Sequence, residues 1–168
     1  MRRILNFLDG INDWIGRIFS WTIVVISLLV VLEVIMRRFL NHPTIWNFEV
    51  VIQLYGFYFM ILAGYTLLNR GHVAVDLIHE KLSLRNQAIL NIISYLIFFF
   101  PFCVIMFLEG ITFAKTSWQM KETSWSVFAP PLYPIKTVIP VASVLLLIQG
   151  LSIFIRQLFV LAKGESYD

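Results

Sequence analysis

The chain has 168 residues, of which 59% are hydrophobic and only 14% are charged. Soluble domains contain roughly 45–50% apolar and about 25% charged residues, so this composition excludes an ordinary soluble domain and indicates a protein surrounded by lipid. The net charge of +3 does not indicate nucleic-acid binding, because the basic residues lie in short gaps between apolar runs, where they act as topology signals.

The first predicted element is a short amphipathic helix over residues 4–17. Its apolar residues recur at helical spacing, and they are Ile4, Leu5, Leu8, Ile11, Trp14, Ile15 and Ile18. Its other face is polar and carries Asn6, Asp9, Asn12, Asp13 and Arg17. This pattern favours a helix that lies in the headgroup plane before the chain enters the bilayer. The alternative is that the segment simply lengthens the first membrane helix.

Four apolar runs follow, and each is long enough to cross ~30 Å of hydrocarbon as a helix of about 20 residues. They predict membrane-spanning helices at about 18–38, 47–68, 87–113 and 135–160. Helices are favoured over barrel strands because the runs lack a two-residue alternation. The predicted fold class is therefore an all-α integral membrane protein with four transmembrane helices, preceded by the interfacial helix, in one membrane domain over 1–168.

The predicted spans contain few chemically active groups. Glu33 lies about one turn from the end of the first run with Arg37 at i+4, which predicts an ion pair at the interface. The alternative is a carboxylate that carries protons. Gln53 and Gln149 are predicted to bridge helices. The single cysteine, Cys103, excludes an internal disulfide and a thiolate metal cluster, and it is interpreted as a packing residue.

The sequence lacks the motifs of membrane enzymes and redox proteins. His42, His72 and His79 fall in predicted loops, whereas a diheme membrane cytochrome needs histidines within its helices. There is no serine in a G-x-S-x-G context, no H-E-x-x-H sequence and no cluster of carboxylates. We therefore expect no enzyme activity, no bound metal and no cofactor, and we expect helices made to pack against a larger partner.

The distribution of basic residues predicts the orientation. Four crossings place both termini on one side, and that side carries eight Lys and Arg residues against five on the other. The positive-inside rule therefore favours cytoplasmic termini, although the Arg37-Arg38 pair argues against it.

The third predicted loop, from about Lys115 to Ile135, is rich in aromatic residues. A Thr-Ser-Trp repeat ends at Trp118 and at Trp125, and both would share a helix face if the third helix continued through the loop. Three prolines between residues 130 and 134 predict an extended approach to the fourth helix. Together with Tyr133, the two tryptophans suit either a belt at the membrane interface or a docking surface for a partner on the outer side.

The first two loops carry an ordered set of residues. The set comprises Arg37, Asn41, Trp46 and Glu49 around the first loop, and Arg70, Gly71, His72 and Asp76 after the second helix. With the chain length and the four helices, it resembles the small membrane subunit (DctQ-like) of tripartite ATP-independent periplasmic (TRAP) transporters over nearly the whole chain. Members of that family often have two adjacent acidic residues after the tryptophan. Here Phe48 takes the first of these places and leaves Glu49 alone.

The resemblance implies a scaffold or accessory permease subunit in the bacterial inner membrane. Its partners would be membrane lipids, a periplasmic substrate-binding protein and a large membrane subunit that moves organic anions by a sodium-coupled elevator motion. The substrates would be carboxylates or related sulfonates, and the eight loop residues would hold structural or interface positions. The alternative function is a self-sufficient small four-helix antiporter that uses Glu33 to exchange protons.

Overall fold

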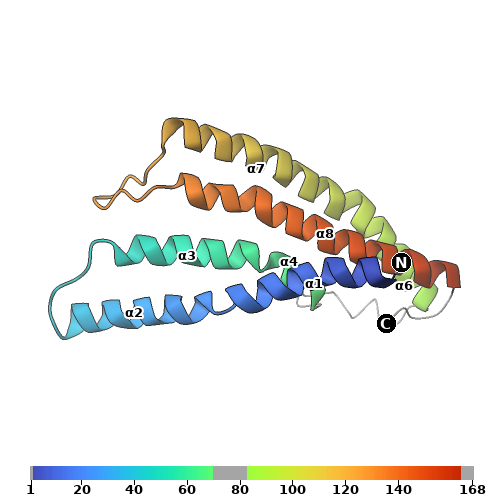
Figure 1. Ribbon diagram of the computed structural model, residues 1–168, viewed down its shortest axis with the longest axis horizontal. Coiled ribbons are helices and arrows are strands. Elements are labelled where there is room, and N and C mark those ends of the chain that lie inside the picture. Colours follow the sequence, from blue (N-terminus) through green and yellow to red (C-terminus); the bar gives the residue numbers. More distant parts are fainter. Residues whose placement is uncertain (1, 70–82, 164–168) are drawn as a thin grey trace.

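A computed structural model describes residues 2–69 and 83–163 of the chain, and these residues are predominantly helical (Figure 1). In chain order the elements are α1 (Arg2–Phe19), α2 (Thr22–Arg38), α3 (Asn47–Ile61), α4 (Ala63–Leu68), α6 (Leu84–Ser94), the π-helical turn η1 (Tyr95–Phe99), α7 (Phe100–Met120) and α8 (Tyr133–Lys163). Four helical spans are long and apolar enough to cross a membrane, at Leu5–Arg38, Asn47–Leu68, Arg85–Met120 and Tyr133–Ala162. The predicted all-α membrane fold with four such spans is confirmed.

Helix α8 is the central element of the described structure. It packs against α7, α6, η1, α4, α3 and α1, whereas α2 packs mainly against α3. The helices form two hairpins, α2 with α3 and α7 with α8. At the end where these hairpins turn, the helices lie in the order α2, α3, α8, α7 (Figure 1). The row therefore has two edges, α2 on one side and α7 on the other, and each edge helix leaves much of its surface uncovered.

The amphipathic segment forms α1, a helix separate from α2. The break lies at Ser20 and Trp21, where the Ser20 hydroxyl donates to the Arg17 carbonyl (2.8 Å), a local bond that competes with the helical ladder. Beyond the break α2 continues in roughly the same direction as α1 (Figure 1). The placement of α1 in the headgroup plane stays a prediction.

The third span contains an irregularity near its middle. Pro101 has no N–H to donate to the carbonyl one turn earlier, and the π-helical turn η1 ends two residues before it. At its far end, α7 stops at Met120, and Lys121 takes a left-handed conformation (φ 47°). Trp125 therefore lies beyond the helix, and the condition under which Trp118 and Trp125 would share one helix face is not met.

The extended segment before the fourth helix is shorter than the one predicted from the three prolines. Helix α8 begins at Tyr133, so Pro134 lies in its first turn, where the missing N–H would have had no helical partner in any case. The extended part ends at Leu132, whose N–H donates to the Glu122 carbonyl (2.9 Å). The loop thus doubles back on itself, with Thr123 bridged to Pro131.

Candidate functional site: a polar cluster between the terminal helices

Five polar side chains join the first and last described helices across the inside of the protein. Asp9 of α1 accepts hydrogen bonds from Gln149 Nε2 (3.0 Å), Ser152 Oγ (2.7 Å) and an Arg156 guanidinium nitrogen (2.5 Å). Asn12 of α1 donates from Nδ2 to Gln149 Oε1 (3.1 Å) and to the Leu145 carbonyl (3.3 Å). We call Asp9, Asn12, Gln149, Ser152 and Arg156 the polar cluster.

The cluster forms because both helices present residues at the spacing of a coiled-coil seam. On α1 the seam contains Leu5, Asp9, Asn12 and Gly16, and on α8 it contains Leu145, Gln149, Ser152 and Arg156. Steps of four, three and four residues keep each set on one face, so the two sets interdigitate when the helices pack. Asn12, Gln149 and Ser152 are all at most 1% exposed. Their polar atoms are thus removed from solvent and must find partners within the protein.

Glycine permits the close approach of α4 to this cluster. A Cβ atom on Gly64 would lie 2.2 Å from Asn12 Oδ1 and 3.2 Å from the Leu145 carbonyl oxygen. Only hydrogen fits at this position, so α4 packs directly over the contact between α1 and α8. Asn12 Oδ1 itself is buried and accepts no hydrogen bond.

Sequence reasoning identified one member of the cluster and missed the others. Gln149 bridges helices as predicted. Gln53 instead donates to the carbonyl of Pro131 (3.3 Å), which lies in the loop before α8. Asp9 and Asn12 were predicted to lie on the polar face of α1, and their contacts with α8 were not predicted. The sequence feature that could have indicated the cluster is the repeated spacing of three or four residues, which the polar residues of α1 and those of α8 have in common.

The turn between α2 and α3 is held by local contacts. Glu33 pairs with Arg37 (3.0 Å), as predicted, and also accepts a hydrogen bond from the Thr44 hydroxyl. The buried Asn47 donates from Nδ2 to the Leu29 carbonyl (2.7 Å), which ties the start of α3 to α2. Asn41 takes a left-handed conformation (φ 51°), which asparagine tolerates better than most residues and which turns the chain after α2.

The other two predicted residues of this turn mark the start of α3. Trp46 immediately precedes the helix, and its carbonyl accepts the Val50 N–H (3.1 Å). Glu49 lies in the first turn, where the helix dipole favours a negative charge. One of its carboxylate oxygens is buried without a hydrogen-bond partner. Phe48, which takes the first of the two places where the family often has acidic residues, is 71% exposed.

The loop between α7 and α8 is anchored by one ion pair. Lys136 Nζ lies 2.5 Å from Glu122 Oε2 and 3.9 Å from the ring centre of Phe113. The hydrogen bond from Lys136 holds the pKa of the Glu122 carboxyl below its ordinary value. The pair ties the beginning of the loop to the first turn of α8.

The aromatic residues of this loop fall into two groups. Trp118 donates from Nε1 to the Thr137 hydroxyl (2.8 Å), and its ring lies 4.3 Å from that of Tyr133. Trp125 is fully exposed in the loop, and the nearby Val127 is 90% exposed. The structure therefore joins Trp118 to Tyr133 and leaves Trp125 apart from both.

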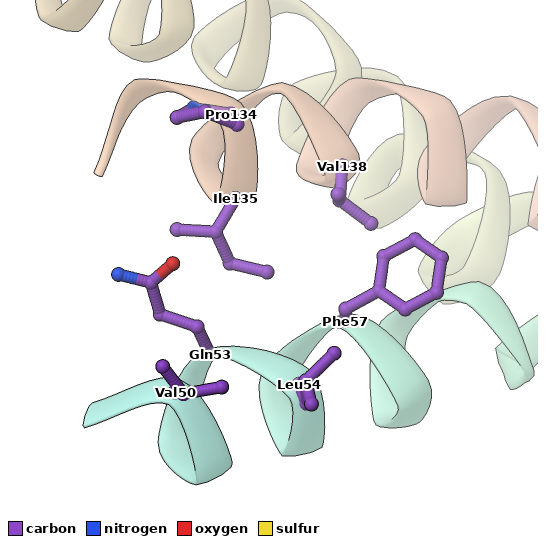
Figure 2. Close-up of a pocket in the computed structure, with 7 residues that line it drawn as sticks. All are labelled: Val50, Gln53, Leu54, Phe57, Pro134, Ile135 and Val138. Carbon is purple, nitrogen blue, oxygen red and sulfur yellow. The ribbon is translucent and has the colours of Figure 1, made fainter. Parts of the chain in front are cut away.

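A groove of about 360 Å³ lies between α3 and α8 near the turns (Figure 2). Its lining residues come from the two facing helices and are Val50, Gln53, Leu54, Phe57, Pro134, Ile135 and Val138. Figure 2 shows the Gln53 amide beside Ile135, with Val138 and Phe57 further along the groove. The Gln53 amide is the one polar side chain among the lining residues, so the groove has no charge with which to bind an anion.

Four of the predicted motif residues, Arg70, Gly71, His72 and Asp76, lie outside the described residues. Within residues 2–69 and 83–163, no three His, Cys, Asp or Glu side chains lie close enough to hold a metal ion.

The chain matches a protein-family model. The family model described as "Tripartite ATP-independent periplasmic transporters, DctQ component" matches residues 26–160. The searches of curated proteins and of solved structures returned no significant match. The matched segment includes all four apolar spans except the N-terminal part of the first and the last two residues of the fourth. The chain therefore belongs to the DctQ component family of TRAP transporters, as a small membrane subunit.

Proposed function

We propose that the chain is a scaffold subunit that packs beside the large, elevator-type membrane subunit of a sodium-coupled, binding-protein-dependent transporter for organic anions. Carboxylates or related sulfonates would be the substrates. The observation that carries the proposal is that the polar side chains inside the spans bond to each other between helices. Asp9, Asn12, Gln149 and Ser152 are occupied in joining α1 to α8, which makes the helices a fixed support.

The chemistry of the groove supports a substrate site elsewhere in the complex. An organic anion needs a cationic group or several converging N–H donors, because an unpaired carboxylate is costly to transfer out of water. The groove between α3 and α8 offers one side-chain amide, and Gln53 already uses that amide to bind the Pro131 carbonyl. This supports a division of labour in which the large subunit binds the anion.

We further propose that the protein lies in the bacterial inner membrane with both termini in the cytoplasm. The loop between α7 and α8 would then face the periplasm. Trp118 and Tyr133 would form part of the interfacial belt, since their rings contact each other at the end of the spans. Trp125, which is fully exposed, would meet the periplasmic binding protein. Replacing Trp125 with alanine should then reduce binding-protein-dependent uptake severalfold, whereas Trp14→Ala at the other end should not.

For the second loop we propose that Arg70, His72 and Asp76 organise the cytoplasmic turn or its contact with the large subunit. Asp76→Ala should lower the amount of complex recovered from membranes. Unchanged assembly and uptake in this variant would show that the assignment is wrong.

Co-purification and reconstitution test the proposed function directly. The tagged chain should retain the large subunit encoded beside it, and uptake into liposomes should require both membrane subunits and the binding protein. Omission of the small subunit should abolish uptake. A chain that purifies alone, and that catalyses ion exchange alone in liposomes, would favour the antiporter function instead.

A further inference from the structure

The exposed side of α7 carries a second seam that no described helix covers. The residues of this α7 stripe are Phe102, Ile105, Glu109, Thr112 and Thr116, and all of them are exposed. Their spacing of three, four, three and four residues is that of a helix-packing seam. On another face of the same helix, Cys103, Gly110, Ala114 and Ser117 have similar spacing and are buried. One seam of α7 is therefore filled and the other is open.

Glu109 lies within the membrane-spanning part of this stripe. The neighbouring Gly110 packs against Ile139 and Pro140 of α8, where a Cβ atom would lie 3.0 to 3.3 Å from them. Lys136 and Arg156, the charged residues that flank the uncharged part of α8, are separated by about 30 Å of helix, which matches the hydrocarbon thickness. Glu109 thus lies roughly one turn inside the boundary that Lys136 marks.

The carboxylate of Glu109 has no hydrogen-bond or ion-pair partner among residues 2–69 and 83–163. Four other acidic residues in this part of the chain are paired with a basic side chain, and they are Asp9, Asp13, Glu33 and Glu122. Glu49 sits at a helix N-terminus. A charged side chain in the hydrocarbon is unfavourable unless it finds a partner, so an uncompensated Glu109 facing lipid would be unfavourable.

The other edge of the row presents a different surface. From Thr22 to Leu32, α2 carries no charged residue, and its large exposed side chains are aliphatic, as lipid requires. The α7 stripe instead becomes polar over its last three residues, Glu109, Thr112 and Thr116. The hydroxyls of Thr112 and Thr116 already bond to carbonyls of their own helix, which leaves the carboxylate as the group in need of a partner.

We propose that the α7 stripe is the contact surface for a transmembrane helix of the large subunit, and that a basic side chain of that helix pairs with Glu109. The inference rests on the proposed function, because it assumes a large partner subunit. Seam spacing suits a helix, and the carboxylate suits a cationic residue inserted opposite it. A second copy of this chain fits poorly, because a two-fold contact along the stripe would bring two Glu109 carboxylates together.

Charge reversal tests the inference in the assembled complex. Glu109→Arg should lower the large subunit recovered with the tagged chain at least tenfold, because it places like charges together, and Glu109→Gln should lower it severalfold. Lys115→Glu is the matched control, since it reverses a charge of α7 outside the stripe and should leave recovery unchanged. Immunoblots of the membranes should show equal amounts of every variant of the small subunit. Recovery of the intact complex with Glu109→Arg would overturn the inference.

Photo-crosslinking gives a second measurement that does not depend on stability. A benzophenone side chain at Ile105 or Thr112 should crosslink to the large subunit, whereas the same group at Leu28 of α2 should label lipid. Three results would each overturn the inference. The first is that only the group at Leu28 crosslinks to the large subunit, the second is that the stripe positions label nothing but lipid, and the third is that the stripe positions crosslink two copies of this chain. In those cases a wild-type complex that still co-purifies would leave the proposed function standing. A wild-type chain that retains no large subunit would instead refute the proposed function itself.

Discussion

The two ends of the helix row are held together in different ways. At the end where α1 and α8 meet, the hydrogen bonds of the polar cluster join residues more than 130 positions apart in the chain. At the other end, Glu33 bonds to Arg37 and Thr44 within the α2–α3 hairpin, and Glu122 bonds to Lys136 within the α7–α8 hairpin. The first kind of contact joins the two hairpins to each other, and the second shapes a single turn.

This difference predicts how the protein responds to substitution. Loss of a long-range contact should allow the hairpins to separate, so it should lower the stability of the whole domain. Loss of a local contact should loosen one turn and leave the rest in place. A substitution at each end, compared with a neutral control on the same element, tests this division.

The largest effect is expected for Asp9→Ala. Three donors, on Gln149, Ser152 and Arg156, would lose their acceptor, and we expect a loss of about 3 kcal/mol in the free energy of unfolding. Asp13→Ala is the matched control on the same helix. Its partner Arg17 is 75% exposed, so the loss should be about 0.5 kcal/mol or less. Unfolding of the purified protein in mixed micelles measures both, and equal losses would contradict the division between the ends.

A smaller effect is expected for Gly64→Ala. The new Cβ atom would meet Asn12 Oδ1 at 2.2 Å and the Leu145 carbonyl, so α4 must move away, at a cost of about 1–3 kcal/mol. Gly56→Ala on α3 is the control, because its Cβ would find its nearest neighbours at 3.9 to 4.0 Å. That variant should be neutral or slightly more stable, since alanine favours helices by up to about 1 kcal/mol over glycine. If both variants lose the same stability, close packing at Gly64 is not the cause.

The sequence predicted contacts of the local kind much better than contacts of the long-range kind. Four apolar runs and the Glu33–Arg37 spacing follow from residues close together in the chain, and both were confirmed. The ion pair between Asp9 and Arg156 can be predicted only if α1 is known to pack on α8. The sequence pattern of one helix does not indicate which other helix it contacts. The apolar and polar faces of α1 were recognised, but no partner helix was predicted for the polar face, because bonds inside the protein depend on which helix packs there.

Irregular local structure was equally difficult to predict. The π-helical turn before Pro101 and the doubled-back loop after Lys121 depend on backbone hydrogen bonds that side-chain patterns do not encode. The position of Trp125 follows from the second of these, since the helix ends at Met120. The ring contact between Trp118 and Tyr133 depends on how α7 meets α8, so residue spacing within one helix could not predict it either.

A local and pH-dependent effect is expected at Glu122. The hydrogen bond from Lys136 lowers the pKa of its carboxyl in the folded state, so this contact stabilises the loop at pH values above the ordinary pKa of 4.5. The stabilisation is lost as the pH falls through the lowered value. A spin label at the exposed Val127 should therefore become more mobile only in strong acid. In Glu122→Gln the label should be mobile throughout and its mobility should no longer change with pH; a variant that keeps the wild-type pH response would show that another group controls the loop.

The smallest effect is expected for Glu33→Gln. Glutamine retains an oxygen that can accept the Thr44 hydroxyl, and the lost partner, Arg37, is 70% exposed and can be solvated by water. The turn between α2 and α3 should therefore persist, and uptake by the assembled three-component transporter should remain close to the wild-type rate. Asn47→Ala gives the contrast at the same turn, because it removes a buried donor to the Leu29 carbonyl and should cost about 1 kcal/mol. A complex that assembles normally with Glu33→Gln but transports nothing would mean that this carboxylate carries protons, and the helix row would then take part in transport as well as supporting it.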